Sequence, residues 1–330
     1  MSNEDYTLQP PAKRPRLEYN SPGKIKKEIW MLPEEILILI FLFCGCQDFE
    51  RAKPLINVCK TWRRLIPSLV RTMELESHLF KCDFSVGMSS LTEMVKLFKN
   101  LEVVSLPHLT DELALELPPT IKELACSDCD TLTNEGLQKI SENKNLEIGF
   151  LFTIIDGDLN NFECFSNCPK LSTLLLGGIG TNVTVESINT LSNLKVLKLY
   201  QTDASWDIEE TLQSINCDSV TTLVLPAHRR DYISEDDDEF QFSGSTGSQE
   251  LSLAIKTCLE NNPTIKKLDI TGHQLNVEHI QDVLNIYGVN LIEFLCSATN
   301  NSIIYNFAFQ RPDTDKEWII DIDVDNQDNL

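Results

Sequence analysis

The chain has 330 residues, of which 42% are hydrophobic and 24% are charged, as in a folded soluble protein. Its formal net charge of −22 gives a surface that repels phosphate backbones, so we expect no nucleic-acid partner. The longest apolar run, from Ile36 to Cys44, is far too short to cross a bilayer, and the two acidic residues before it are not typical of a signal peptide, so no membrane partner is expected.

Residues 1–29 are expected to form a disordered, Pro-rich tail. Lys13, Arg14 and Arg16 give this tail a basic cluster, in contrast to the acidic remainder of the chain. The cluster resembles a monopartite nuclear-localisation signal, which implies recognition by a nuclear import receptor. The alternative is a basic tail that no receptor reads. We therefore expect the protein in the nucleus, in the cytoplasm or in both.

Residues 30–70 carry more apolar surface than a segment of this size can bury by itself. Pro33 suits the first turn of a helix, where its missing N–H costs nothing. The expected helix has one apolar face made of Ile36, Leu37, Ile40 and Phe41, and further apolar residues around the cylinder at Leu39, Leu42 and Phe43. A second helical stretch, from Val58 to Leu65, can cover only one side of it. The uncovered side predicts a partner protein.

The order of these residues resembles an F-box. The pattern starts as Leu32-Pro33-x-x-Ile36-Leu37-x-x-Ile40-Phe41 and ends as Val58-Cys59-x-x-Trp62-Arg63-x-Leu65. The resemblance implies that the segment binds a Skp-type adaptor and, through it, a cullin and a RING protein. The residues implied to carry adaptor binding, with Trp62 supporting the helical hairpin from behind, are Leu32, Pro33, Ile36, Leu37, Ile40 and Phe41. The alternative is an ordinary amphipathic hairpin. Pro54 departs from the family pattern and is compatible with the start of a third helix.

From about residue 100 the sequence repeats the template L-x-x-L-x-L. Its first positions are Leu101, Ile121, Leu146, Leu171, Leu194, Val220, Ile265 and Leu291. The period, in the twenties of residues, is that of the leucine-rich repeat, an α/β solenoid with parallel strands on the concave face and helices on the convex face. About eight repeats are therefore expected within residues 71–330. One long interval contains an acidic, Gly/Ser-rich insertion at 229–248, which resembles a solvated loop.

Two further features refine this prediction. The segment Asn167-Cys168-Pro169-Lys170-Leu171 and the run from Cys129 to Leu137 resemble the cysteine-containing subtype of repeat that is common in F-box proteins, in which we expect the small thiol to fill the tight turn after each strand. At the end of the chain, Ile320, Ile322 and Val324 alternate with aspartates, as in a half-buried strand. Residues 302–330 are therefore expected to cap the last repeat.

No motif for catalysis or metal binding survives inspection. Cys126-x-x-Cys129 lacks a second ligand pair at metal spacing, so packing is the better account. The glycines at 177–180 lack the ending of a phosphate loop, and Asp321-x-Asp323-x-Asp325 lacks the glycine of a calcium loop. The eleven cysteines have no paired spacing and favour reduced thiols. We expect no metal, no cofactor and no catalytic residues, and thus no enzyme.

The combination of the two resemblances implies the substrate-recognition subunit of a cullin–RING (Skp–cullin–F-box) E3 ubiquitin ligase, which promotes the ubiquitination and degradation of bound target proteins. One alternative is an acidic leucine-rich-repeat nuclear scaffold that binds basic proteins such as histones. Another is a GTPase-activating leucine-rich-repeat protein, although the repeats of that class are longer than those found here.

The substrate is expected on the concave face, at the third, fifth and seventh template positions. In the middle repeats these positions are Thr173, Leu175, Gly177, Val196, Lys198, Tyr200, Thr222, Val224 and Pro226. The exposed row is unusually apolar, and its candidate substrate-binding residues are Leu175, Val196, Lys198, Tyr200 and Val224. Ile148, Phe150 and Phe152 extend the row unless Gly149 marks a one-residue slip. Alternatively, the insertion or the C-terminal segment covers it.

Overall fold

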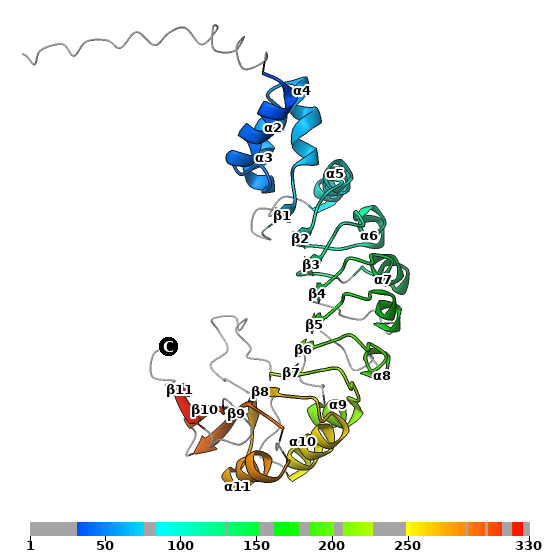
Figure 1. Ribbon diagram of the computed structural model, residues 1–330. Helices are drawn as coiled ribbons and strands as arrows, with labels where there is room; N and C mark the ends of the chain where they lie inside the picture. The colour runs from blue at the N-terminus through cyan, green and yellow to red at the C-terminus, as the bar shows by residue number, and fades with distance from the viewer. Residues whose placement is uncertain are drawn as a thin grey trace, which may run out of the picture.

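The computed structural model describes residues 32–75, 84–129, 131–151, 162–177, 185–200, 207–226, 249–287, 290–300, 303–311 and 319–325. Three short helices lead into an arc, in which one sheet lines the inner side and helices cover the outer side (Figure 1). The predictions on Lys13, Arg14 and Arg16, on the insertion 229–248 and on Phe152 concern residues outside these ranges. Within them, no helix is both long and apolar enough to cross a membrane.

The first unit consists of three helices and a 3-10 turn: α2 (Glu34–Phe43), α3 (Phe49–Ile56), α4 (Lys60–Leu65) and η1 (Ile66–Ser68). Pro33 is the N-cap of α2, as its position in the sequence predicts. The carboxylate of Asp48 caps α3 by accepting the backbone N–H of Glu50 at 2.8 Å. Pro54 lies inside α3 and does not start a helix, because the Asp48 cap already starts α3 at Phe49.

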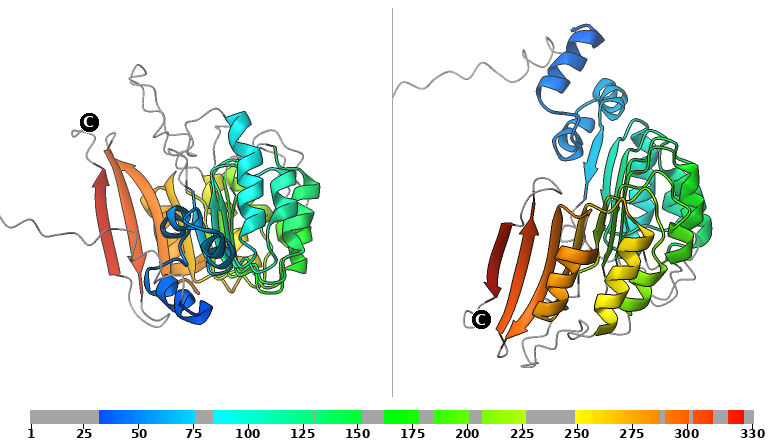
Figure 2. Two further views of the ribbon diagram at one scale, coloured as in Figure 1. Left: turned by 90° about the horizontal axis from the view of Figure 1, so that it is seen from above. Right: turned by 60° about the horizontal axis from the view of Figure 1, so that its bottom comes forward.

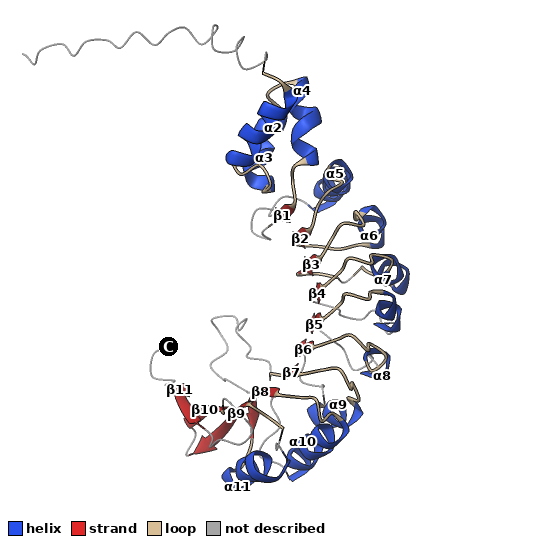
Figure 3. Cartoon of the chain, in the orientation of Figure 1, coloured by secondary structure: helices blue, strands red, loops and turns tan. Residues whose placement is uncertain are grey.

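The described strands form a single sheet whose spatial order equals the order along the chain (Figure 3). Neighbouring strands from β1 to β9 are parallel, and β10 and β11 are antiparallel additions. The strands are β1 (Thr72–Glu74), β2 (Val103–Leu106), β3 (Glu123–Cys126), β4 (Ile148–Leu151), β5 (Thr173–Gly177), β6 (Val196–Tyr200), β7 (Thr222–Val224), β8 (Lys267–Gln274), β9 (Glu293–Asn300), β10 (Ile303–Gln310) and β11 (Ile319–Asp325). The predicted α/β class and every strand of the template, β2 to β9, are confirmed.

Helices follow most strands and lie on the outer side of the arc (Figure 2). Threonine caps start two of them, because the hydroxyl of Thr110 accepts the N–H of Leu113 and that of Thr133 accepts the N–H of Glu135. The outer elements are α5 (Phe84–Leu97), α6 (Asp111–Glu116), α7 (Asn134–Ser141), η3 (Phe162–Asn167), α8 (Val185–Ile188), α9 (Ile208–Ser214), α10 (Gln249–Asn261), α11 (Val277–Asp282) and the π-helical turn η4 (Val283–Tyr287).

The strand register settles the ambiguity at Gly149. This glycine pairs with Leu124 on β3 and with Leu174 on β5, both of which are buried, so the template is not shifted in this repeat. A methyl group at Gly149 would lie 3.5 Å from the side chain of Leu174, in ordinary contact. Ile148 and Phe150 therefore lie on the concave face.

The sequence also contains a ninth copy of the template, which was missed. Val70, Met73 and Leu75 occupy its first, fourth and sixth positions and are all buried. Met73 lies in the middle of β1 and pairs in parallel with Val104 of β2, and Val70 and Leu75 lie just outside the ends of the strand. The signal was present in the sequence, but the longer interval before Leu101 concealed it.

Small polar side chains join successive repeats in the turn before a strand. The Cys168 thiol donates to the Ser141 carbonyl at 3.2 Å, and the Cys217 thiol contacts the Ile188 carbonyl at 3.6 Å. At the equivalent place Asn262, fully buried, donates to the Ile215 carbonyl at 2.8 Å. The prediction that the thiol fills the turn after each strand holds for Cys129. It is wrong for Cys168 and Cys217, which lie in the turn before a strand. The carbonyls that need a hydrogen-bond donor there are those at the end of the helix of the preceding repeat.

The antiparallel strands β10 and β11 close the C-terminal end of the arc. Phe309 is buried and stacks on Phe294 of β9, with ring centroids 6.1 Å apart. The Arg311 Nε–H donates to the Leu291 carbonyl at 2.5 Å. The predicted strand around Ile320 is confirmed as β11, although Ile320 itself is 56% exposed.

Candidate protein-interaction surfaces

The helix α2 separates its apolar residues into a buried and an exposed set. Leu37 and Phe41 are 3% and 1% exposed and pack into the core. The exposed apolar residues, which we call the α2 stripe, are Ile36 (42%), Leu39 (60%), Ile40 (40%) and Phe43 (94%). Their spacing of three, four and seven residues places them along one face of the helix.

The predicted grouping of Ile36, Leu37, Ile40 and Phe41 on one face is therefore wrong. Leu37 and Phe41 are four residues apart and point to the inside, whereas Ile36 and Ile40 are displaced by one residue, or about 100° of rotation. Only the second pair is accessible to a partner. Sequence reasoning named Leu39 and Phe43 as further apolar residues but left them out of the adaptor-binding set, although their spacing from Ile36 places them on the same face.

The residues behind the stripe hold α2 in place. Trp62 on α4 contacts Phe41 edge to face, with ring centroids 4.9 Å apart, as expected of a residue that supports the hairpin from behind. The Arg64 guanidinium forms an ion pair with the Glu34 carboxylate at the start of α2. Of the two residues before the helix, Leu32 is half-buried against the core and Pro33 is exposed.

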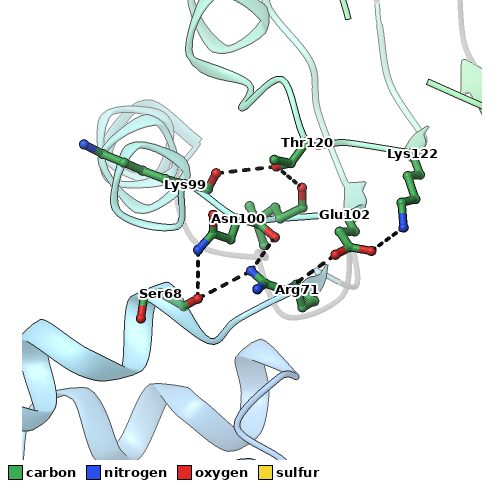
Figure 4. Close-up of polar contacts among 8 residues, drawn as sticks. Ser68, Arg71, Lys99, Asn100, Glu102, Thr120 and Lys122 are labelled. Carbon is green, nitrogen blue, oxygen red and sulfur yellow. Dashed lines mark hydrogen bonds and ion pairs between the residues drawn. The ribbon is translucent and has the colours of Figure 1, made fainter. Parts of the chain in front are cut away.

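A polar network connects the helical unit to the first repeats (Figure 4). The Arg71 guanidinium donates to the Ser68 carbonyl at 3.4 Å and to the Asn100 carbonyl at 3.1 Å, and pairs with the Glu102 carboxylate at 3.5 Å. The Asn100 side-chain amide also donates a hydrogen bond to the Ser68 carbonyl, at 2.9 Å. Sequence reasoning did not single out these residues, because nothing in their types or spacing marks them.

The same network continues along the sheet. The Lys122 ammonium contacts the Glu102 carboxylate at 2.7 Å. This hydrogen bond lowers the pKa of Glu102 and raises the pKa of Lys122. The helical unit and the solenoid therefore share both a polar seam and a continuous hydrophobic core, which fixes the α2 stripe relative to the sheet.

The second surface lies on the concave side of β4 to β7. Pairing between the strands aligns the outward residues in two rows, one through Val196 and the other through Lys198. We call this set the concave patch; its members are Ile148, Phe150, Thr173, Leu175, Val196, Lys198, Thr222 and Val224. The predicted substrate residues Leu175, Val196, Lys198 and Val224 thus lie together. Tyr200 follows Val196 and Lys198 on the same face of β6.

The predicted substrate residues are less exposed than the sequence pattern indicated. Leu175 and Val224 are only 6% and 7% exposed, whereas Val196, Lys198 and Tyr200 are half-buried. The two aliphatic residues lie on either side of Lys198 in the ladder, at residue partners Leu175–Lys198 and Lys198–Val224. These two buried residues form an apolar floor beside the Lys198 side chain.

The charges near this floor are few. Burial raises the pKa of Tyr200, and the Asp269 carboxylate raises it further, so the phenol stays protonated. Asp269 accepts hydrogen bonds from the Thr271 backbone N–H at 3.0 Å and the Thr271 hydroxyl at 2.7 Å. On the neighbouring row, Lys267 is paired with Glu293 at 2.8 Å.

The cysteines and acidic residues do not assemble a metal site in the described part of the chain. Burial raises the pKa of Cys168 and of Cys217 to about 11 and that of Cys258 to about 12, so these thiols are protonated at neutral pH. Asp321, Asp323 and Asp325 belong to the extended strand β11, which lacks the turn of a calcium loop.

Comparison with known proteins assigns no family. No protein-family model matches the sequence, and no curated protein matches it. Among solved structures, the crystal structure of the Rad7 and Elc1 complex in yeast is similar at 17% sequence identity and a TM-score of 0.36. The match covers 77% of this chain and spans 60% of that chain. A similarity this distant identifies neither a family nor a partner.

Proposed function

We propose that this chain is the substrate-recognition subunit of a Skp–cullin–F-box ubiquitin ligase and has no catalytic residues of its own. The observation that supports the proposal is the α2 stripe, in which four large apolar side chains on one helix are exposed at the start of an F-box-like segment. A row with this spacing is how an amphipathic helix contacts an apolar groove. The occupant we propose is a Skp-type adaptor, through which a cullin and a RING protein join.

The proposed role of the chain is to position the target protein. A receptor that holds its target beside a ubiquitin-charged enzyme raises the effective concentration of the target lysine without forming or breaking a bond itself. This role requires a fixed distance between the adaptor surface and the target surface. The contacts of Arg71 with Ser68, Asn100 and Glu102 favour such a fixed arrangement.

The direct test is co-purification with the adaptor and the cullin. Replacing Ile36 and Ile40 by Glu places two charges in the stripe and should abolish adaptor binding, because an unpaired charge in an apolar contact is costly. The control is Leu253→Glu on α10, an exposed leucine at 56% that lies outside the stripe. Undiminished adaptor binding by a folded Ile36→Glu/Ile40→Glu protein would contradict the proposal.

A further inference from the structure

The concave patch contains a single charge. Of its eight residues only Lys198 is ionised; the others are aliphatic, aromatic or threonine. A lone cation is unexpected in this place, since the chain as a whole carries a net charge of −22. Within the described ranges, no ion pair joins Lys198 to another residue.

The neighbours of Lys198 give it an apolar setting. Leu175 and Val224, on the strands to either side, are buried, and Val196 precedes it on the same face of β6. The first acidic residue along its row is Asp269, beyond Val224, and that carboxylate is engaged by Thr271. A charge pair formed over such a floor is stronger than one in open water, because the local dielectric constant is lower.

We infer that the concave patch binds an extended peptide segment in which one Asp or Glu carboxylate, flanked by aliphatic side chains, meets Lys198. The inference rests on the proposed function and names the recognition feature of the target protein. Apolar target side chains would contact the half-buried Phe150 and Val196, while the carboxylate would pair with the ammonium group. Both halves of the contact match the surface in polarity and charge.

A carboxylate fits this surface better than a phosphate. A phosphate group carries nearly two negative charges and is usually held by arginine forks or by several cations. The patch offers one lysine and no arginine, and Asp269 lies near Tyr200 at its edge. A single ammonium group balances a single carboxylate.

The experiment uses the full chain without adaptor and three pools of fluorescent synthetic peptides. The pools share flanking positions drawn from Val, Leu, Ile and Phe and differ only at the centre, which is Glu, Gln or phosphoserine. Measured by fluorescence polarisation, the Glu pool should bind about tenfold or more tightly than the Gln pool, as a charge-assisted hydrogen bond requires. Equal binding of the Glu and Gln pools, or tighter binding of the phosphoserine pool, would overturn the inference.

Substitutions of single lysines test whether Lys198 causes the preference for the Glu pool. Lys198→Gln should remove the preference for the Glu pool, and Lys198→Glu should reverse it in favour of a fourth pool with a central Lys. The matched control is Lys195→Gln, an exposed lysine on the segment that leads into the same strand, which should keep the wild-type preference. A preference that persists in Lys198→Gln contradicts the inference, provided that thermal unfolding shows the variant to be folded.

The outcome is separable from that of the adaptor test. The Ile36→Glu/Ile40→Glu protein should bind the Glu pool as the wild type does, because the two surfaces lie on different elements. If peptide selectivity fails while the adaptor binds, only the inference on the target is overturned. If the adaptor fails to bind while selectivity persists, the proposed function is overturned and the peptide site remains.

Discussion

Phe49 of α3 and Phe98, next to the end of α5, contact each other edge to face, with ring centroids 5.5 Å apart and an angle of 81° between the rings. Phe98 precedes the first template position, Leu101, by three residues, the place that Cys168 and Asn262 hold in later repeats. In those repeats the small polar side chain donates a hydrogen bond to a backbone carbonyl at the end of the helix of the preceding repeat. In the repeat that contains Phe98 the neighbour is the apolar side of α3, so a phenyl ring takes the place of the polar group.

This contact makes the helical unit part of the solenoid core. We expect Phe49→Ala to destabilise the whole chain by about 3–5 kcal/mol, the usual cost of truncating a buried phenylalanine. The measurement is urea unfolding followed by circular dichroism. Phe43→Ala is the control, because Phe43 is 94% exposed and should change stability by no more than about 0.5 kcal/mol. Equal stability of the two variants would mean that α3 and the first repeat unfold separately.

The two sets of residues on α2 should separate folding from binding. Leu37→Ala should cost about 2–5 kcal/mol in stability, because Leu37 is 3% exposed. Ile36→Ala should change stability little and weaken adaptor binding, since Ile36 is 42% exposed. Unfolding curves and adaptor titrations of both variants provide the measurement. Loss of adaptor binding by a fully folded Leu37→Ala protein, with Ile36→Ala unaffected, would reverse the assignment of the faces.

The sequence predicted the sheet far better than it predicted the surfaces. The template at Leu171, Leu194 and Val220 fixes which residues point inward, because burial on one side of a parallel strand requires an apolar residue at a fixed interval. The exposure of Leu175 depends instead on the side chains that lie beside it on the adjacent strands, such as Lys198 of β6. Periodicity along one strand carries no information on these neighbours.

On α2 the limitation has another cause. When nearly every residue of a helix is apolar, as from Ile36 to Phe43, the pattern of polarity no longer marks the inner face. The direction of Phe41 is instead marked by the ring that it meets, that of Trp62. This contact arises only after the hairpin has folded.

The basic tail provides a prediction about location that the described residues leave untested. Changing Lys13, Arg14 and Arg16 together to Ala should move a fluorescent fusion from the nucleus to the cytoplasm, because import receptors read clustered basic side chains in extended segments. Changing Lys24, Lys26 and Lys27 together to Ala is the charge-matched control. A nuclear signal unaffected by the first triple change, or equally reduced by both, would show that the cluster at 13–16 is not the specific address.

The buried Asn262 should be essential for stacking of the late repeats. Its side chain accepts the Cys217 N–H at 2.6 Å and donates to the carbonyls of Ile215 and Cys258 at 2.8 and 2.7 Å. Asn262→Leu removes the side-chain partner of the Cys217 N–H and of the Ile215 carbonyl, whereas the Cys258 carbonyl keeps the backbone N–H of residue 262, and each unsatisfied buried group costs about 1–3 kcal/mol. Urea unfolding should therefore show a large loss of stability, whereas exposed Asn193→Leu should show almost none. Equal effects would contradict a structural role for the amide.

The buried thiols predict how stability depends on pH. The folded-state pKa is about 11 for Cys168 and Cys217 and about 12 for Cys258, because burial disfavours the thiolate. In the unfolded chain these thiols ionise near their ordinary pKa of about 8.5. Below that pH both states hold the protons, so the contribution of the thiols to stability is constant. As the pH rises from about 8.5 towards 11, the unfolded state loses protons first and stability falls.

The measurement is the free energy of unfolding in urea at a series of pH values from 7 to about 10.5, with reductant present throughout. Lysines and tyrosines also titrate in this range, so the informative quantity is the difference between the wild type and a variant with Cys168, Cys217 and Cys258 all changed to Ala. The variant should be less stable at pH 7, because each replacement removes a buried sulfur, but its stability should decline less steeply as the pH rises. Parallel curves for the two proteins would show that these thiols ionise equally readily in the folded and unfolded chains, and that their burial is not maintained in solution.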